Sequence, residues 1–477
     1  MDMTRQLHST ARVAACIWAL AFLFSCEGGK EEIDATYLRI TQGGSSLTEL
    51  PFAQTGGNAV IQVVSDVDWE VGCDQDWCTL SNVSGQAGLT VNLKVTVGAY
   101  SGETQRSAVL SFSAGSLSAK VTVKQTGLSN KDETGAETAM AAVRGMRAGK
   151  NLFNTLDCTG DWIHEWTEDK PSDYETAWGN PVVTRAQIHA FKEAGFTAMR
   201  VPVTWYPHMD ENWVVKEDWM ARVEEVVGYV LDEGMYCILN VHHDTGADSE
   251  SAWLNAELAN IGPITEKYTA LWQQIATRFN HFGEKLLFES LNEIIQFKYG
   301  WNDPKNDNTP YEAVNRLNQS FVNTVRATGG NNGRRNLIVN TYRADPGKQT
   351  ITAFQLPEDS VDSHLAVEVH VYIPGDFIMG ESKAAWTDAN ATQVENAFKV
   401  LADRFVTAGI PVVVGEWGGD QDHAASEGDI VQLADCYMAQ AAKYGFATFW
   451  WTCLLDRKEM KWILPNVRDA IISGTKN

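Results

Sequence analysis

The stretch Leu-Leu-Phe-Glu-Ser-Leu-Asn-Glu, residues 286–293, is a short apolar run that changes to polar residues at Asn292 and Glu293. Its length and flanks predict a buried β-strand. Seven more runs of this kind occur in the region after residue 140, and helical patterns lie between them. The eight predicted strands cover residues 151–153, 196–201, 236–241, 286–291, 336–341, 365–371, 412–415 and 446–451.

Alternation of strand and helix, repeated in this way, predicts a (β/α)₈ TIM barrel over residues 140–477. The fifth helix has the weakest sequence pattern of the set. A doubly wound parallel sheet is the alternative fold, but no glycine-rich nucleotide-binding motif follows the first predicted strand. The clearest predicted helices cover residues 185–194, 220–232, 265–282, 312–328, 393–408 and 430–444.

Residues 35–127 have a different pattern, with short alternating runs rich in Val and Thr that Gly, Ser and Asn separate. This pattern predicts a small antiparallel β-sandwich. Residues 128–139 are polar and acidic, which is typical of a linker. The expected fold class is therefore α/β, a TIM barrel preceded by a small all-β sandwich.

Residues 1–26 resemble a bacterial lipoprotein signal. Arg5 and Arg12 accompany an apolar run, 13–24, that is too short to span a bilayer and ends at Ser25-Cys26. We expect Cys26 to carry a lipid that anchors the chain to the outer membrane, at the cell surface or on the periplasmic side. The alternative is an ordinary signal without lipid. Three early acidic residues resemble the surface-export signal of Bacteroidetes lipoproteins: Glu27, Glu31 and Glu32.

The composition narrows the classes of partner. The chain has 477 residues and a formal net charge of −23, which argues against nucleic acid because phosphates would be repelled. The chain has 17 Trp residues, and we expect most of them to pack in the core. The flat faces of Trp side chains also suit sugar rings. Cys73 and Cys78 are close enough in sequence to form a disulfide, and two free thiols are the equal alternative. No pattern requires a metal or an organic cofactor, and a tethered monomer is expected.

The carboxyl ends of barrel strands carry functional residues. Polar and aromatic side chains follow nearly every predicted strand, which core packing does not explain. These residues are Arg200, His242, His243, Asp244, Asn292, Glu293, His370, Tyr372, Glu416, Trp417, Trp450 and Trp451.

Glu293 and Glu416 follow the fourth and seventh predicted strands and should face each other across the barrel mouth. Hydrolysis of a glycosidic bond needs a proton donor and, in retaining enzymes, a nucleophile about 5–5.5 Å away. Arg200 is suited to keeping Glu416 ionised, and Tyr372 to donating a hydrogen bond to it. Asn292 is suited to binding the sugar 2-hydroxyl.

Other interpretations of these residues stay open. A single Glu after a strand is often a salt-bridge or helix-capping residue. His242 and His243, together with Asp244, contain zinc-ligand types. Because neighbouring side chains on a strand point to opposite faces, we expect the two imidazoles to diverge and predict no metal there.

Residues 147–470 resemble glycoside hydrolase family 5, subfamily 4. The resemblance implies a retaining endo-β-1,4-glucanase acting on xyloglucan, mixed-linkage glucan or cellulose. It implies Glu293 as acid/base and Glu416 as nucleophile. It implies that six residues surround the −1 subsite, Arg200, His242, Asn292, His370, Tyr372 and Trp451, and that three contact the glycone side, Asn154, Asp157 and His243. The matching stretches are 151–157, 175–181, 196–205, 240–243, 288–293, 325–332, 370–372 and 415–418.

Four positions depart from that pattern. The family usually has Trp at Lys150, Gly at Phe153, and Asp-Asn at Thr452-Cys453. The departures leave open whether Trp450 or Trp451 faces the site. Alternative functions are a β-mannanase or xylanase on the same fold, or a non-catalytic glycan-binding lipoprotein.

The N-terminal sandwich resembles the BACON domain, an immunoglobulin-like module. The resemblance implies a spacer or a carbohydrate-binding role, and we favour the spacer. The matching stretches are Asp68-Trp69, 77–81, 106–108 and 121–127, of which the last is the most specific.

Overall fold

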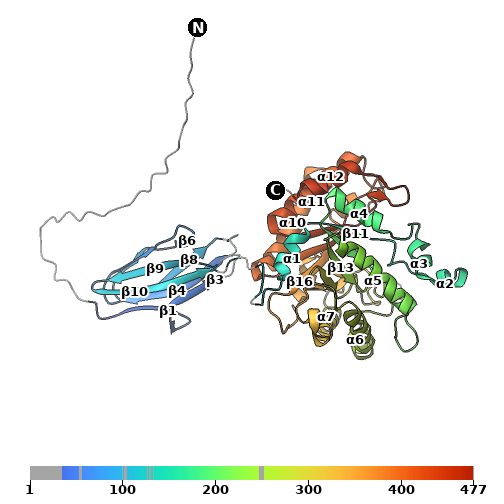
Figure 1. The fold of residues 1–477 in the computed structure, drawn as a ribbon. Coiled ribbons are helices and arrows are strands. Elements are labelled where there is room, and N and C mark those ends of the chain that lie inside the picture. Colours follow the sequence, from blue (N-terminus) through green and yellow to red (C-terminus); the bar gives the residue numbers. More distant parts are fainter. Residues whose placement is uncertain are drawn as a thin grey trace, which may run out of the picture. The chain divides into compact units, whose positions relative to one another are not determined.

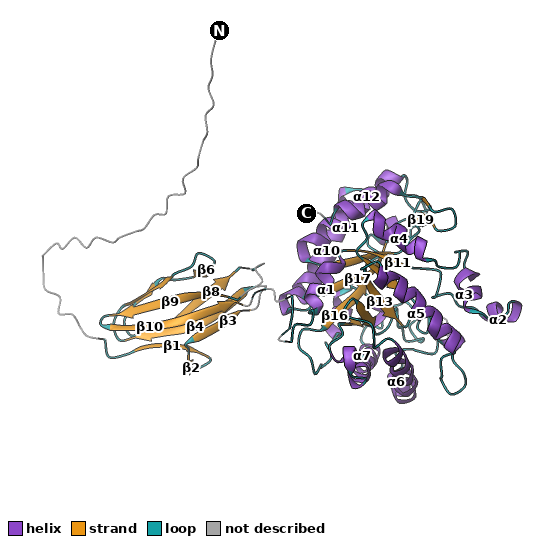
Figure 2. Cartoon of the chain, viewed as in Figure 1, coloured by secondary structure: helices purple, strands orange, loops and turns teal. Residues whose placement is uncertain are grey.

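The computed structural model describes residues 35–475, apart from 53–55, 99, 101–104, 126, 128–129, 133 and 247–251. Cys26 and the predicted signal lie outside the described residues. Two compact units are present, a β-sandwich and an α/β barrel. Figure 2 shows that strands alone build the first, whereas helices surround the strands of the second. In the described part of the chain, every helix is too short or too polar to cross a bilayer.

The sandwich consists of two five-stranded sheets. Buried and exposed side chains alternate along its long strands, so each sheet turns one face to the core. Trp69 packs against Phe112 in that core, with ring centroids 6.2 Å apart. Cys73 and Cys78 are free thiols, which resolves the open disulfide question. One sheet contains β2 (Ser45–Ser46), β1 (Leu38–Gln42), β4 (Gly57–Ser65), β8 (Val91–Val97) and β6 (Cys78–Leu80). The other contains β3 (Glu49–Phe52), β10 (Leu117–Gln125), β9 (Arg106–Ala114), β5 (Trp69–Cys73) and β7 (Ser84–Gly85).

Eight parallel strands close into a barrel in chain order, which confirms the predicted fold class. Most are one or two residues shorter than predicted, because the apolar sequence continues beyond the hydrogen-bonded ladder. They are β11 (Ala148–Asn151), β12 (Ala198–Val201), β13 (Tyr236–Asn240), β14 (Leu286–Glu289), β15 (Leu337–Asn340), β16 (Leu365–His370), β17 (Val412–Trp417) and β18 (Ala447–Trp450).

The first strand, β11, begins three residues before its predicted start. Its sequence, Ala-Gly-Lys-Asn, lacks an apolar run and was therefore hard to recognise. Gly149 is required there, because a Cβ atom would lie 2.2 Å from the Phe449 ring on the neighbouring strand β18. The absence of a side chain at Gly149 thus lets the first strand pair with the last.

Helices cover the outside of the barrel (Figure 1). The weak fifth helix is α8, only six residues long, whose Thr350, Ile351 and Thr352 are poor helix formers. Helix α1 precedes the barrel and packs its apolar face on the inward side chains at the amino ends of the strands. The helices are α1 (Ala139–Met146), α2 (Asp161–Trp166), α3 (Pro171–Ala177), α4 (Arg185–Ala194), α5 (Glu217–Asp232), α6 (Ile261–Arg278), α7 (Thr309–Ala327), α8 (Lys348–Ala353), α9 (Gly375–Ile378), α10 (Asp388–Arg404), α11 (Glu427–Tyr444) and α12 (Pro465–Ser473).

Candidate active site

Glu416 is the deepest of the two carboxylates at the mouth of the barrel. It lies on β17, where the pairing with β16 is irregular: Val369 pairs with Val414, but His370 pairs with Glu416. The extra residue is Gly415, and a Cβ atom there would lie 1.8 Å from a carboxylate oxygen of Glu368. The sequence therefore needs glycine before Glu416, and the irregularity directs the glutamate toward the barrel axis.

Two donors bind the Glu416 carboxylate. Arg200 Nη1 donates to Oε1 at 2.9 Å, and the Tyr372 hydroxyl donates to Oε2 at 2.9 Å. The side chain of Glu416 is only 6% exposed. The two donors predicted from sequence are therefore both in place, one a buried cation and one a hydroxyl.

Arg200 is held rigidly from beneath. Glu289 accepts two hydrogen bonds from it, from Nε and from Nη2, each at 2.8 Å. Asn292 Oδ1 accepts from Nη2 at 2.9 Å, and Asn151 Oδ1 accepts from Nη1 at 3.0 Å. The guanidinium is fully buried, so this fork of acceptors fixes which nitrogen faces Glu416.

Glu293 follows β14 and lies opposite Glu416, with His370 between them. His370 Nδ1 lies 2.7 Å from Glu293 Oε1 and 3.5 Å from Glu416 Oε2. One carboxylate oxygen of each glutamate comes within 4.8 Å of the other. The Glu293 side chain is 28% exposed, whereas that of Glu416 is 6% exposed. Glu293 therefore faces the open cleft, and Glu416 lies below it. This close approach of the two carboxylates fits a retaining pair, whose carboxyl groups stand about 5–5.5 Å apart.

The charge of His370 couples the two glutamates. Burial disfavours the charged imidazole, but three surrounding carboxylates raise the pKa of His370 well above its usual value; they belong to Glu416, Glu368 and Glu293. Burial also raises the pKa of Glu293, yet the positive charge and hydrogen bond of His370 outweigh it, so that pKa lies below the usual value. Burial raises the pKa of Glu416 to about 7.

In a pair of catalytic carboxylates the proton donor ordinarily has the higher pKa, and here the order is reversed. The cause is the position of His370, which hydrogen-bonds Glu293 and lies farther from Glu416. Because the two carboxylates and the imidazole interact at close range, they titrate as one coupled group rather than as independent residues.

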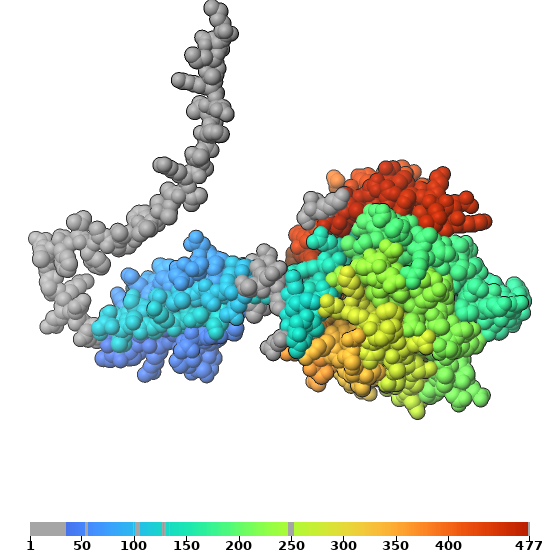
Figure 3. All heavy atoms as spheres, viewed as in Figure 1, coloured from blue at the N-terminus to red at the C-terminus, as the bar shows by residue number. Residues whose placement is uncertain are grey.

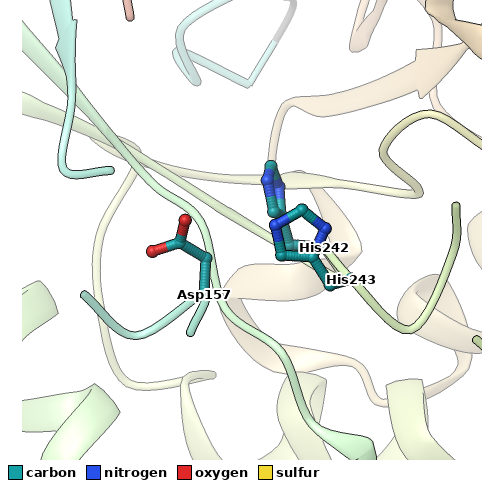
Figure 4. Close-up of side chains that lie close together, drawn as sticks. All are labelled: Asp157, His242 and His243. Carbon is teal, nitrogen blue, oxygen red and sulfur yellow. The ribbon is translucent and has the colours of Figure 1, made fainter. Parts of the chain in front are cut away.

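Asp157, His242 and His243 lie close together (Figure 4), in the loops that follow β11 and β13. The two imidazole rings are 4.4 Å apart, so the prediction that neighbouring histidines diverge is wrong. The reason is that β13 ends at Asn240, before either of them. Each of the three residues brings one possible ligand atom within 4.8 Å of the others.

Asp157 and His242 already form hydrogen bonds with other groups of the chain. Asp157 accepts the backbone N–H groups of Asn154 at 3.0 Å and Thr155 at 2.6 Å. The Asn240 amide lies 3.1 Å from His242 Nδ1. Asp244, which follows the two histidines in the sequence, accepts hydrogen bonds from the Trp205 backbone N–H and the Trp253 indole N–H, each at 2.7 Å. We call Asn154, Asp157, His242 and His243 the polar wall.

At the end of β18 the structure separates the two tryptophans. Trp450 is fully buried against Trp417, at 4.9 Å between centroids. Trp451 is half-buried and lies parallel to the His242 ring, at 5.7 Å. Trp451 is therefore the one that faces the site.

The departures from the family pattern gather beside Trp451. The Phe153 ring lies 5.6 Å from the Trp451 ring. Lys150 is buried, and its Nζ donates to the carbonyls of Asn151, Trp450 and Trp451 at 2.8, 3.2 and 2.9 Å. Burial lowers the pKa of Lys150 well below its usual value. An amine thus holds together the ends of the first and last strands.

Sequence reasoning missed Glu289 and Glu368, two buried carboxylates beneath the site. Glu289 binds Arg200, and Glu368 Oε1 lies 2.8 Å from His370 Nε2. Both stand inside predicted strands, where each interrupts an apolar run. Burying a carboxylate inside a strand costs free energy unless a partner binds it. That cost is the signal that could have identified Glu289 and Glu368.

Comparison with known families gives two matches. Residues 157–454 match the family "Cellulase (glycosyl hydrolase family 5)". Residues 67–126 match BACON, described as a putative N-terminal binding domain. Both resemblances seen in the sequence are confirmed.

Several characterised proteins are similar over the barrel. The cellulase/esterase CelE of Acetivibrio thermocellus is 35% identical over 71% of this chain and 40% of its own length. Endoglucanase A of Clostridium longisporum is 33% identical, and 66% of its length is matched. The chain thus spans less than two thirds of the length of these two relatives. The xyloglucan-specific endo-β-1,4-glucanase BoGH5A of Bacteroides ovatus is 33% identical over 77% of this chain and 76% of its own.

Solved structures agree with this picture. PbGH5A of Prevotella bryantii, crystallised with a xyloglucan tetradecasaccharide, has a TM-score of 0.66 and 37% identity over 72% of this chain and 99% of its own. A GH5-4 broad-specificity endoglucanase from an uncultured bacterium has a TM-score of 0.66 and 39% identity over 72% and 97%.

Proposed function

Because the chain belongs to glycosyl hydrolase family 5, we propose that it is a retaining endo-β-1,4-glucanase that cleaves β-glucans such as xyloglucan, mixed-linkage glucan or cellulose. The observation that carries this proposal is the pair Glu293 and Glu416. Their carboxylate oxygens lie within 4.8 Å across His370, on opposite sides of the barrel mouth. The names of the relatives, endoglucanases and a xyloglucanase, support the substrate class.

In the first step, a Glu416 oxygen attacks the anomeric carbon while the bond to the leaving oxygen breaks. Glu293, which shares a proton with the charged His370 across their 2.7 Å hydrogen bond, gives a proton to that oxygen, and a covalent glycosyl ester forms on Glu416. In the second step, Glu293 takes a proton from water, the water oxygen attacks the same carbon, and the ester bond breaks. Two inversions leave the anomeric configuration unchanged.

The donors around Glu416 suit the nucleophile. Arg200 and Tyr372 each donate to it at 2.9 Å, which stabilises the ionised carboxylate before attack and as leaving group afterwards. Glu293 is the more exposed carboxylate, so the leaving group and the incoming water reach it from the open cleft.

Asn292 and the aromatic wall provide sugar contacts. Since Asn292 Oδ1 accepts from Arg200, its amide nitrogen is left to donate, and we assign it to the sugar 2-hydroxyl. Trp451, His242 and His243 supply faces and polar edges for the glycone, with Asn154 and Asp157 beside them.

The test is the release of reducing ends from xyloglucan, mixed-linkage β-glucan, carboxymethylcellulose, mannan and xylan. We expect internal cleavage of at least one β-glucan, and loss of nearly all of it in Glu416→Ala. Cleavage of mannan or xylan alone would replace the proposal with a mannanase or a xylanase. Binding without cleavage of any polymer would replace it with a glycan-binding protein.

We also propose that the protein is a lipoprotein anchored through Cys26, with the sandwich as a spacer between membrane and barrel. The signal-like residues 1–26 and the linker-like residues 128–139 support this arrangement.

A further inference from the structure

Helix α2 carries two tryptophans on its outer side. Trp162 is 39% exposed and Trp166 is 79% exposed, the highest value among large apolar side chains in the described part of the chain. Residues four apart share one helix face, and the two rings lie 6.1 Å apart. Ile163, on the neighbouring side of the helix, is buried and anchors the helix to the barrel. We call Trp162 and Trp166 the α2 aromatic pair.

The aromatic pair belongs to the same face of the barrel as the active site. The loop after β11 contains Asp157 of the polar wall, and α2 begins four residues later at Asp161. Four residues span at most about 14 Å, so α2 starts close to the cleft. Figures 1 and 3 show this segment projecting at the edge of the barrel.

Two contacts link α2 to the glycone side. The Thr159 hydroxyl, just before α2, hydrogen-bonds the Tyr206 hydroxyl beyond β12. Helix α3 packs on α2 and is followed by Trp178, whose ring lies 5.6 Å from the His243 ring. Trp178 is 36% exposed, so exposed aromatic side chains occur both next to the polar wall and on α2.

A cavity of about 300 Å³ adjoins the start of α2. Its lining includes Asp161, His164, Tyr206 and Lys216, and Lys216 forms an ion pair with Asp169 at 2.5 Å. Hydroxyl, imidazole and paired charges suit a neutral ligand rich in hydroxyl groups. The carboxylates on this segment disfavour an anionic one.

From these observations we infer that the α2 aromatic pair and the adjoining cavity form a distal binding site for a β-glucan chain. The chain would continue from the glycone end of the cleft past Trp178. The inference rests on the proposed function. Indole faces bind the apolar faces of sugar rings, which explains two exposed tryptophans. Two rings offer far less than the roughly 800 Å² per partner that a stable protein interface needs, so a glycan fits better than a protein.

The experiment compares a polymer with a short substrate in the full-length chain. In Trp162→Ala/Trp166→Ala, we expect kcat/KM on mixed-linkage β-glucan to fall about tenfold, mainly through KM. The value on cellotetraose should stay unchanged, because that substrate ends before α2. The matched variant Trp162→Phe/Trp166→Phe keeps two aromatic faces and should retain most of the polymer activity. An equal loss on both substrates, or no loss on the polymer, would overturn the distal site.

A binding measurement separates this inference from the proposed function. In a Glu416→Ala background, mixed-linkage β-glucan in a native gel should retard the protein, and the double Ala change should remove most of the retardation. If the wild type hydrolyses no β-glucan, the proposed function fails, and the gel still decides on the α2 pair. Unchanged retardation without the two indoles would refute the pair's role.

Discussion

Glu416 lies between two donors and beside a charged imidazole, and its ionisation depends on all three. Burial and the charge of Glu293 raise the pKa of Glu416, His370, Arg200 and Tyr372 lower it, and the balance is a pKa of about 7. Because the nucleophile must be ionised, activity should be lost as the pH falls through about 7. The acid limb of kcat/KM therefore reports on the groups around Glu416.

Tyr372→Phe removes one donor from the Glu416 carboxylate. Loss of a hydrogen bond to the charged form raises the pKa, so the acid limb of kcat/KM should move to higher pH by about one unit, which corresponds to about 1.4 kcal/mol. The pH dependence of aryl β-cellobioside hydrolysis measures this. An acid limb that stays in place or moves to lower pH would show that Tyr372 does not stabilise the ionised glutamate.

Sequence reasoning found the functional residues that follow strands and missed those inside strands. Glu293 and Glu416 were recognisable because polar residues ended apolar runs. Glu289 and Glu368 stand inside such runs, where only the cost of burying a carboxylate points to a partner, and Lys150 gave no sign that it binds three carbonyls. The order of the two glutamate pKa values could not be predicted from the sequence either. It depends on His370 Nδ1 lying 2.7 Å from Glu293 but 3.5 Å from Glu416, a difference of 0.8 Å.

Strand β17 determines where the nucleophile points. The irregular pairing at Gly415 is the element-scale feature that turns Glu416 toward the barrel axis. Its neighbour Glu368 occupies the space that a side chain at residue 415 would need. A strand without this irregularity would change which face Glu416 lies on.

Gly415→Ala should therefore damage both stability and catalysis. A Cβ atom 1.8 Å from Glu368 must displace it, and we expect a loss of about 1–3 kcal/mol in the free energy of unfolding, together with a large fall in kcat/KM. Thermal unfolding and hydrolysis of β-glucan measure the two effects.

Gly418→Ala is the matched control. A Cβ atom at residue 418 has its nearest neighbours at 3.5 Å, an ordinary contact, so the melting temperature should stay near that of the wild type. Equal melting temperatures for both variants would contradict the steric account of Gly415.

The elements themselves were largely predictable, except where local sequence and tertiary structure disagree. The eight-fold alternation indicated the barrel, but β11 lacks apolar residues and α8 contains β-branched ones. In both places packing by neighbours, such as Phe449 against Gly149, replaces local preference.

The whole chain joins a catalytic barrel to a small sandwich and to a signal-like N-terminus. Fold class followed from the pattern of elements, because barrels and sandwiches differ in periodicity. Substrate choice among β-glucans did not follow, since it depends on loops such as the one that carries α2. Membrane attachment rests on residues 1–26 alone.

Cys26→Ser should release the protein from the membrane fraction, because no acceptor for the lipid remains. Cell fractionation followed by immunoblotting measures this. Cys73→Ser, a half-exposed thiol of the sandwich, should leave the distribution unchanged. Retention of the Cys26→Ser variant in membranes would argue against the lipid anchor.

The proposed mechanism requires Glu416 to form a covalent bond to the sugar. A 2-deoxy-2-fluoro-β-cellobioside with a good leaving group slows the second step, so the glycosyl-enzyme should accumulate. Mass spectrometry of the digested protein should then find a fluorocellobiosyl group on the peptide that contains Glu416, and none in Glu416→Ala. A modification on another residue, or hydrolysis that inverts the anomeric configuration, would contradict the account.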